Sequence, residues 1–413
     1  MLHQFYSDPK VLQRLRGGPL GPYMDGIASV LFELGYPRQW TGQRQLHLLG
    51  ELGQWLERLG LGVEDLNEHR IDEFLHQPAQ QRVSIRHTRA VLRLLLGHLR
   101  ETGILSVPRV ETDDSPLGRI EQEFTRYLVE QRGLVQTTVN RQLAAIRLFL
   151  GERFGTGPLL LSEVTVADVT QFVLRSCRPG TVRRGEALVS ALRSFFRFLH
   201  LRGDIAVDLA AAVPRAAYWR LSGLPKSLPA EQVKRLVESC DRSRPVGQRN
   251  YALLLLLARL GLRAGEIVAL RLEDLDWHSG ELTVRGKGRR LDRLPMLQEV
   301  GEALVTYIRY GRPRCSTRRV FVRSTAPYRE LGHASTVSSI VKRALERAGL
   351  NPASKGAHLL RHSLATELLR QEASLGEIGQ ILRHRRPSTT EIYAKVDLEA
   401  LRTLAQPWPG AHP

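Results

Sequence analysis

The sequence predicts a mainly α-helical chain with one small antiparallel β-sheet. Through most of the 413 residues, apolar side chains recur every three or four positions, which is the spacing of a helix. At residues 281–296 the pattern changes, and apolar and polar residues alternate on both sides of a Gly-Lys-Gly tripeptide. Polar, proline-containing stretches interrupt the helical pattern twice. They divide the chain into three predicted domains, at residues 1–107, 116–206 and 222–408.

Composition indicates a soluble globular protein with a polyanionic partner. Hydrophobic residues make up 42% of the chain and charged residues 25%, both ordinary values. The charge balance is unusual, because 60 Lys and Arg face 42 Asp and Glu, for a formal net charge of +18. Nucleic acid is the first partner that this surplus suggests, and a merely basic protein is the alternative. The most apolar segment, Tyr251 to Leu260, is too short to span a membrane, so we expect no membrane partner.

The sequence predicts neither a metal site nor a disulfide framework. Cys177, Cys240 and Cys315 lie far apart, and no CxxC spacing occurs. A reducing cytoplasm is the simplest compartment for such a chain. There is also no phosphate-binding P-loop and no cluster of acidic metal ligands, so we expect no cofactor.

Two sets of helices with a similar order are predicted in the first half of the chain. An irregular arm at 1–20 precedes four apolar stripes of helical period between residues 23 and 105. After an acidic linker at 108–116, four more segments follow in the same order. Each set ends in a long basic helix that is followed by glycine. The matching pattern predicts a duplicated four-helix unit.

The second half begins with two helices and a turn that carries an arginine. Arg263 follows Gly261, and Glu266 lies one helical turn further on, where its carboxylate could hold the guanidinium by a charge-assisted bond. An ordinary surface Arg–Glu pair is the alternative. The alternating stretch at 281–296 then predicts a β-hairpin with Lys287 at its tip. A third strand is predicted at 318–324, RRVFVRS.

The stretch from Gly356 to Lys395 gathers the residues with the clearest chemistry. His358 and Arg361 are three apart, so on a helix they share one face and can converge on one anion. His384 and Tyr393 follow, the tyrosine on a short helical segment. A tyrosine hydroxyl has a pKa of about 10 and is a poor nucleophile at neutral pH. It becomes effective beside cations and a base, and a phosphodiester is the natural target of such a set.

Three motifs in this half, HLLRHSLAT, ILRH and TTEIY, resemble the signature of the tyrosine recombinases, also called the phage integrase family. The segment LGLRAGEIVAL is similar to a further signature of that family. The resemblance spans roughly the second half of the chain. It implies a mixed α/β catalytic domain that cleaves DNA through a 3′-phosphotyrosyl bond, without metal or ATP.

The resemblance also implies the main catalytic roles. Arg263, supported by Glu266, and Arg361 would grip the non-bridging oxygens of the scissile phosphate, where negative charge builds in the transition state. Tyr393 would attack in line. Lys287 would protonate the leaving 5′ oxygen, although the neighbouring hairpin arginines are alternative phosphate contacts.

The histidines carry the remaining implied roles. His358 would take the tyrosine proton in cleavage and return it in religation, and His362 competes with it on residue type. His384 would hydrogen-bond the phosphate. It follows Leu-Arg where the family usually has Leu-Gly, and a glycine there would permit a helix C-cap with positive φ. Arg383 would either force a different turn or add a phosphate contact.

The same resemblance implies DNA contacts in the helical domains. The domain at 116–206 resembles the SAM-like core-binding domain of the family, and its segment 133–149 is similar to a helix that faces DNA. A solvated helix face is the alternative for each of its residues. The first domain, a second SAM-like repeat, would read DNA as an arm domain or contact neighbouring protomers. The predicted DNA contacts are Thr137, Thr138, Asn140, Arg141, Arg183, Arg184, Arg289 and Arg290.

The implied function is site-specific DNA recombination, the integration or excision of a mobile element, in the cytoplasm at the nucleoid. The partners would be double-stranded DNA target sites and further copies of the chain in a tetrameric synapse, or related recombinases of the same element. The extended N-terminus and the C-terminal tail look like those of transposon recombinases. A catalytically silent DNA-binding member and a type IB topoisomerase are the alternatives.

Overall fold

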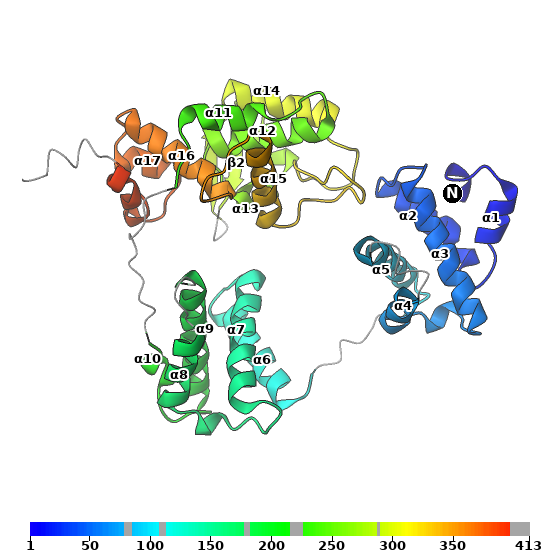
Figure 1. The fold of residues 1–413 in the computed structure, drawn as a ribbon, viewed down its shortest axis with the longest axis horizontal. Coiled ribbons are helices and arrows are strands. Elements are labelled where there is room, and N and C mark those ends of the chain that lie inside the picture. Colours follow the sequence, from blue (N-terminus) through cyan, green and yellow to red (C-terminus); the bar gives the residue numbers. More distant parts are fainter. Residues whose placement is uncertain (78–84, 107–112, 177–181, 215–225, 287–289, 397–413) are drawn as a thin grey trace, which may run out of the picture. The chain divides into compact units, whose positions relative to one another are not determined.

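The computed structural model separates the chain into two units, Pro108–Gly223 and a second unit made of Met1–Val107 and Leu224–Pro413. Helices dominate both units, and a three-stranded antiparallel sheet lies in the second, so the predicted fold class is confirmed (Figure 1). None of the described helices is long and apolar enough to cross a membrane. The structure describes residues 1–77, 85–106, 113–176, 182–214, 226–286 and 290–396, of which 85–87, 182–184 and 396 are described by their backbone alone.

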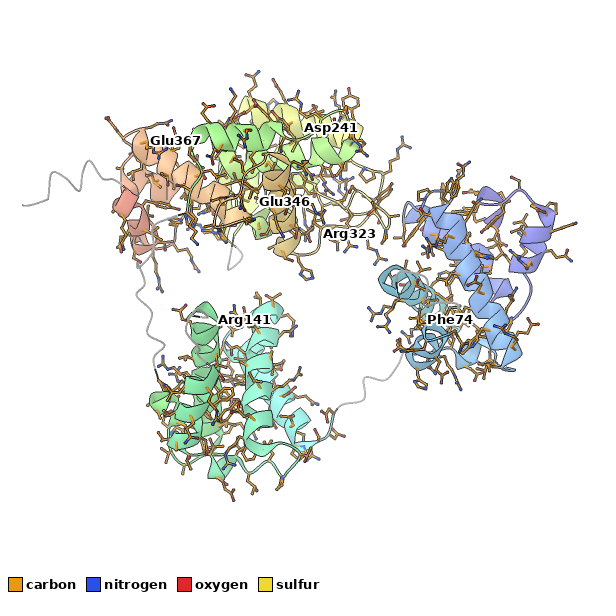
Figure 2. All side chains as sticks on the ribbon, in the orientation of Figure 1. Phe74, Arg141, Asp241, Arg323, Glu346 and Glu367 are labelled. Carbon is orange, nitrogen blue, oxygen red and sulfur yellow. The ribbon has the colours of Figure 1, made fainter. Side chains whose placement is uncertain are left out.

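The N-terminal helices enclose a core made largely of leucines. They are α1 (Pro9–Leu15), α2 (Met24–Glu33), α3 (Thr41–Arg58), α4 (Glu68–Leu75) and α5 (Ile85–Glu101). Phe74 lies on α4 (Figure 2), and its ring packs on that of Trp55 of α3 with centroids 5.7 Å apart. The irregular arm predicted at 1–20 is wrong, because α1 forms there and Leu2 and Phe5 are buried in this core. The apolar residues of this segment are irregularly spaced, so periodicity did not predict their burial.

The unit Pro108–Gly223 repeats this order of helix lengths around an aromatic core. Its helices are α6 (Pro116–Arg126), α7 (Gln136–Phe154), α8 (Val166–Ser176), α9 (Val182–Arg202) and α10 (Leu209–Ala212). The first four have 11, 19, 11 and 21 residues, against 10, 18, 8 and 17 in α2 to α5. Phe124 and Phe195 meet edge to face, with centroids 5.2 Å apart. The duplication itself and the three domain boundaries remain predictions.

The part of the chain from residue 226 onward is built around one helix that is apolar on all sides. The helices here are α11 (Ala230–Glu238), α12 (Pro245–Arg259), α13 (Ala264–Ala269), α14 (Gln298–Thr306), α15 (Ala334–Arg347), α16 (Ala357–Arg370) and α17 (Leu375–Ile381). In α12, Leu253 through Leu257 are at most 1% exposed, which confirms the predicted buried helix. It packs against α11, α14 and α16 and so fixes α16, the helix along which the segments of the candidate site meet.

The sheet confirms the predicted hairpin but not the predicted third strand. Its strands are β1 (Leu275–Asp276), β2 (Glu281–Arg285) and β3 (Leu291–Pro295), in the order β1-β2-β3. Leu282 pairs with Leu294 across the hairpin, whose tip at 287–289 is outside the described residues. Residues 318–324 form only isolated bridges. The Arg312 guanidinium donates to the carbonyls of Arg319 and Val320 in this segment and of Thr317 just before it, so these acceptors are already occupied by a side chain.

Candidate active site and nucleic-acid interface

Segments that are far apart in sequence meet along α16. The turn before α13 brings Arg263, α16 brings Arg361, and the turn after α17 brings His384. The 3₁₀ segment Glu391–Val396 brings Tyr393 and contacts both α16 and α17. Gly261 makes the close approach feasible, because its φ is +57° and a Cβ there would lie 2.7 Å from Leu382 Cδ2.

Arg361 is a buried cation tied to two backbone carbonyls. It is 4% exposed, and its guanidinium donates to the carbonyl oxygens of Gly261 and Leu382. Burial, together with the charges of Arg263 and Arg383, lowers the pKa of Arg361 to about 10. The group is still positively charged at neutral pH, and its desolvated charge is available to an incoming anion.

Arg263 and Glu266 form the charge-assisted pair that the sequence predicts. Arg263 precedes α13, and its amide donates to Oε2 of Glu266 at 2.8 Å while its Nη1 donates to Oε1 at 2.7 Å. Glu266 is 4% exposed, whereas the Arg263 side chain is 36% exposed. The carboxylate therefore anchors the arginine from inside, and the guanidinium reaches the surface.

The Leu382–His384 turn keeps the backbone conformation that a glycine would favour. Arg383 adopts φ +55°, so the expectation that it forces a different turn is wrong. Its side chain is buried and its Nη2 donates to Oε2 of Glu266 at 2.8 Å. The His384 ring Nδ1 lies 2.7 Å from Oγ1 of Thr390. Burial, followed by the charge of Arg361, lowers the pKa of His384 to about 4, so the ring is neutral at pH 7.

Tyr393 is held by a histidine other than the one implied by resemblance. The tyrosine is 1% exposed, and its hydroxyl lies 2.8 Å from Nδ1 of His362. Burial raises the pKa of Tyr393 to about 12, and the charge of Arg361 opposes that rise. His358 is exposed one turn earlier in α16, with its ring centroid 6.5 Å from that of His362. The geometry thus favours the competitor, His362, as the partner of the hydroxyl.

The hairpin residues are only partly described. Lys287 and Arg289 are outside the described residues. Arg290 pairs with Asp292, with Nε to Oδ1 at 2.7 Å. It also lines a cavity of 690 Å³ whose wall includes His384. The hairpin thus borders the space beside the second histidine.

The charge balance of the site favours a multivalent anion. Three guanidinium groups, those of Arg263, Arg361 and Arg383, lie around the carboxylate of Glu266, which bonds two of them. Burial and the mutual repulsion of these cations lower the pKa values of Arg361 and Arg383. A bound phosphate group would offset that repulsion with its own negative charge. Among the described residues, no group of His, Cys, Asp and Glu is arranged to hold a metal ion.

Comparison with known proteins decides the family. Residues 226–399 match the model of the phage integrase family. The chain is 43% identical to the putative integrase/recombinase y4rA of Sinorhizobium fredii over 98% of both chains. It belongs to the phage integrase family. A second relative, tyrosine recombinase XerD of Mycobacterium tuberculosis, is 32% identical over 71% of this chain and 96% of its own.

Solved structures show the same fold at lower identity. A lambda integrase dimer bound to a COC' core site superimposes with a TM-score of 0.52 and 18% identity, covering 71% of this chain and 98% of that one. The Tn1549 transposon integrase in complex with a circular intermediate DNA gives 0.52 at 17% identity, covering 68% and 99%. The tyrosine recombinase described here is accordingly an enzyme that breaks and rejoins DNA in site-specific recombination.

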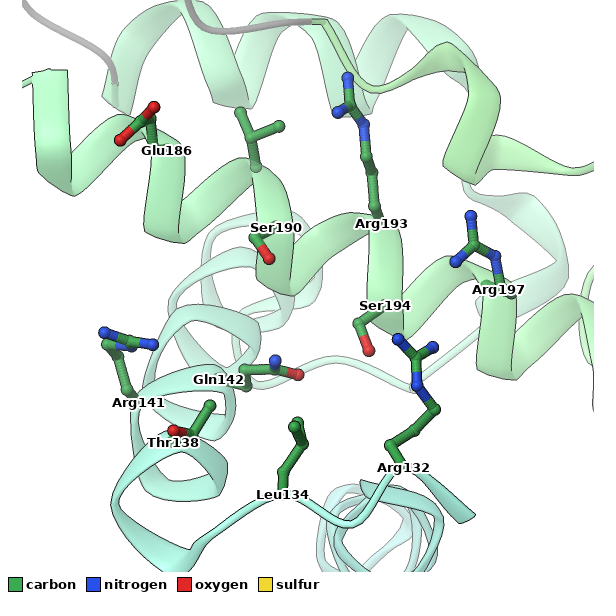
Figure 3. A pocket seen from close by; sticks show the side chains of 11 residues that line it. Arg132, Leu134, Thr138, Arg141, Gln142, Glu186, Ser190, Arg193, Ser194 and Arg197 are labelled. Atoms are coloured by element: carbon green, nitrogen blue, oxygen red, sulfur yellow. The ribbon is translucent and has the colours of Figure 1, made fainter. Parts of the chain in front are cut away.

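The unit Pro108–Gly223 of the recombinase carries a basic hollow between α7 and α9. The hollow measures 640 Å³, and Figure 3 shows four arginines around it, Arg132, Arg141, Arg193 and Arg197. Arg141 lies near one end of α7 (Figure 2). Of the predicted contacts, Thr138 and Arg141 line this hollow.

The other predicted contacts in this unit divide into two groups. Thr137 and Asn140 are exposed on α7, where Gln136 donates to Asn140. Arg183 and Arg184 belong to the first turn of α9, where only the backbone is described. Sequence reasoning missed Arg193 and Arg197, which are four apart on α9. That spacing is a signal of a shared face, although it does not reveal the facing helix.

Proposed function

We propose that this recombinase integrates or excises a mobile element by cleaving DNA through a 3′-phosphotyrosyl bond to Tyr393. The observation that carries the proposal is the pairing of a buried tyrosine hydroxyl with His362 at 2.8 Å, beside Arg361. Full-length relatives support the mobile-element assignment. The integrase/recombinase y4rA covers 98% of this chain, whereas the XerD relative covers 71%.

The cleavage step can be written with its bonds balanced. The Tyr393 oxygen attacks the scissile phosphorus, the bond from phosphorus to the 5′ oxygen breaks, and a phosphotyrosyl bond replaces it. The phenol proton passes to His362, which lies within hydrogen-bonding distance, and Lys287 gives a proton to the departing 5′ oxygen. Because one phosphodiester replaces another, the step needs neither ATP nor an oxidant.

The main role proposed for the cations is to hold the phosphate. Arg263, Arg361 and His384 would donate hydrogen bonds to the non-bridging oxygens, and the two guanidinium charges stabilise the pentacoordinate transition state. His384 is neutral in the free protein, so an approaching phosphate would also favour its protonation. Tyr393 is 1% exposed, so the 3₁₀ segment Glu391–Val396 has to shift before the hydroxyl meets DNA.

We assign DNA recognition to the basic hollow and the hairpin. We expect the recombinase to assemble as a tetramer on two duplexes. Arg132, Arg141, Arg193 and Arg197 would contact the phosphate backbone, which positions the protein without reading sequence. Lys287 remains the expected proton donor to the leaving oxygen of the cleaved strand. The first helical domain, α1 to α5, would bind DNA or neighbouring protomers.

Covalent capture tests the proposal. Target sites come from selecting a random duplex pool for binding by Tyr393→Phe. Selected sites are then nicked near candidate cleavage positions and incubated with each protein in EDTA without ATP. A denaturing gel should show a protein–DNA adduct with the wild type alone. Binding by both proteins with no adduct would favour the silent DNA-binding alternative, and relaxation of a plasmid that lacks the site would favour a topoisomerase.

A further inference from the structure

Arg383 occupies a backbone position that L-amino acids rarely adopt. Its φ is +55°, a region in which glycine is the residue without a steric cost. The side chain is nevertheless buried, and 5% of its surface is exposed. Its Nε and Nη1 have no hydrogen-bond partner among the described residues. An arginine with both a strained backbone and a desolvated charge requires a compensating role.

The contacts of Arg383 converge on the groups that would hold the phosphate. Its Nη2 donates to Oε2 of Glu266 at 2.8 Å, the same oxygen that accepts the Arg263 amide at 2.8 Å. Its carbonyl oxygen accepts from Nη2 of Arg263 at 3.3 Å. The preceding carbonyl, that of Leu382, accepts from Arg361. The Leu382–Arg383 turn therefore contacts Arg263 and Arg361, and also the Glu266 carboxylate that anchors Arg263.

We infer that Arg383 is a positioning residue for strand cleavage, which fixes the direction of the Arg263 guanidinium through Glu266. Holding Oε2 leaves Oε1 of Glu266 for Nη1 of Arg263 at 2.7 Å. We assign Arg383 to positioning and not to phosphate contact because its Nη2 is committed to Glu266, whereas the Arg263 side chain is 36% exposed. The inference rests on the proposed function, since it concerns the geometry of the same site.

Burial explains why an arginine rather than a lysine suits this position. A guanidinium is weakly hydrated and has a planar fork, so it can remain charged beside a carboxylate in a dry site. Its charge also adds to those of Arg263 and Arg361 around the space for the anion. Lysine would keep the charge but could not reproduce the directional contact.

The decisive variant is Arg383→Gly, compared with Arg383→Lys. Glycine suits the positive φ, so the fold should persist, and thermal melting checks this. If the Arg383 side chain had only a structural role, Arg383→Gly would leave the cleavage rate unchanged and the melting temperature unchanged or higher. The inference predicts instead a 10- to 100-fold slower single-turnover cleavage of the nicked site, with the DNA Kd changed less than threefold. Arg383→Lys should recover part of the rate.

A double-mutant cycle with Glu266→Gln tests the proposed route. If Arg383 acts through Glu266, the double variant should cleave no more slowly than Glu266→Gln alone. Wild-type cleavage by Arg383→Gly, or losses that multiply in the double variant, would overturn the inference.

A crystal structure of Arg383→Gly separates this inference from the proposed function. The expected result is an Arg263 guanidinium that has left Oε1 of Glu266. An unmoved Arg263 would overturn the inference whatever the activity. If the wild type formed no adduct but Arg263 moved in the variant, the proposed function would fail while the positioning role stood.

Discussion

Replacing His362 by phenylalanine should slow strand cleavage strongly and change DNA binding much less. The ring Nδ1 lies 2.8 Å from the Tyr393 hydroxyl, the distance of a direct proton transfer. The pKa of Tyr393 is raised to about 12 by burial, so only about one phenol in 10⁵ is ionised at pH 7, against about one in 10³ for an ordinary tyrosine. Spontaneous ionisation is therefore a poor source of nucleophile.

The expected loss follows from the usual contribution of a general base. Such a group accelerates a reaction by about 10² to 10⁴, or about 2.7 to 5.5 kcal/mol of transition-state free energy. In His362→Phe, hydroxide has to remove the proton, so the cleavage rate should rise about tenfold per pH unit through the alkaline range below the Tyr393 pKa of about 12. The wild type, with its base in place, should depend much less steeply on pH.

The assay is single-turnover adduct formation on a nicked target site between pH 6 and 9.5, at saturating DNA. His358→Phe is the matched control, since it removes the other histidine on the same helix. Equal rates and equal pH profiles for His362→Phe and wild type, with the loss confined to His358→Phe, would refute the assignment. That result would return the proton role to the residue implied by family resemblance.

Three further predictions concern charge. Arg361→Ala should abolish cleavage and lower the unfolding free energy by about 2 to 4 kcal/mol, because two buried carbonyls lose their donor. Tm measures the loss of stability, and retained cleavage by this variant would contradict the prediction. His384 has a folded pKa of about 4 against 6.5 unfolded, so the unfolded state binds more protons between these values and stability should fall as pH drops from 6.5 to 4. Because the ring is half-exposed, we expect about 1 to 2 kcal/mol, measured by denaturant titration and absent in His384→Gln. Arg141→Ala should weaken DNA binding and reduce the salt slope by about 1, whereas Arg147→Ala, whose guanidinium is held by Glu121 at 2.6 Å, should leave the slope unchanged.

Much of the fold follows from local sequence rules. The continuous leucine run of α12 predicts a buried helix, and the alternation around Gly-Lys-Gly predicts the β2–β3 hairpin. Ser374 precedes an apolar helical stretch with Glu377 three residues later, and it caps α17 in a capping box with that glutamate. The segment 318–324 has strand-like composition, but Arg312, seven residues before Arg319, donates to its carbonyls. Strand-like composition does not reveal which side chain will take up these backbone acceptors.

In the site, contacts between neighbours in the sequence are predictable, and contacts between distant segments are not. The Arg263–Glu266 bond is predictable because both residues lie within one helical turn. Which histidine meets Tyr393 depends on how the segment 391–396 folds back on α16, 31 residues away along the chain. The Arg383–Glu266 contact spans 117 residues and depends on a left-handed turn on which an arginine is unexpected. Spacing alone could not have given either contact.

The central claim is that Tyr393 forms the covalent bond to DNA. Adduct formed on the selected site can be digested with nuclease and trypsin and sequenced by tandem mass spectrometry. We expect the peptide 386–395 to carry a nucleotide joined through its 3′ phosphate to Tyr393. A nucleotide on another residue, or an unmodified Tyr393 in every adduct, would contradict the account.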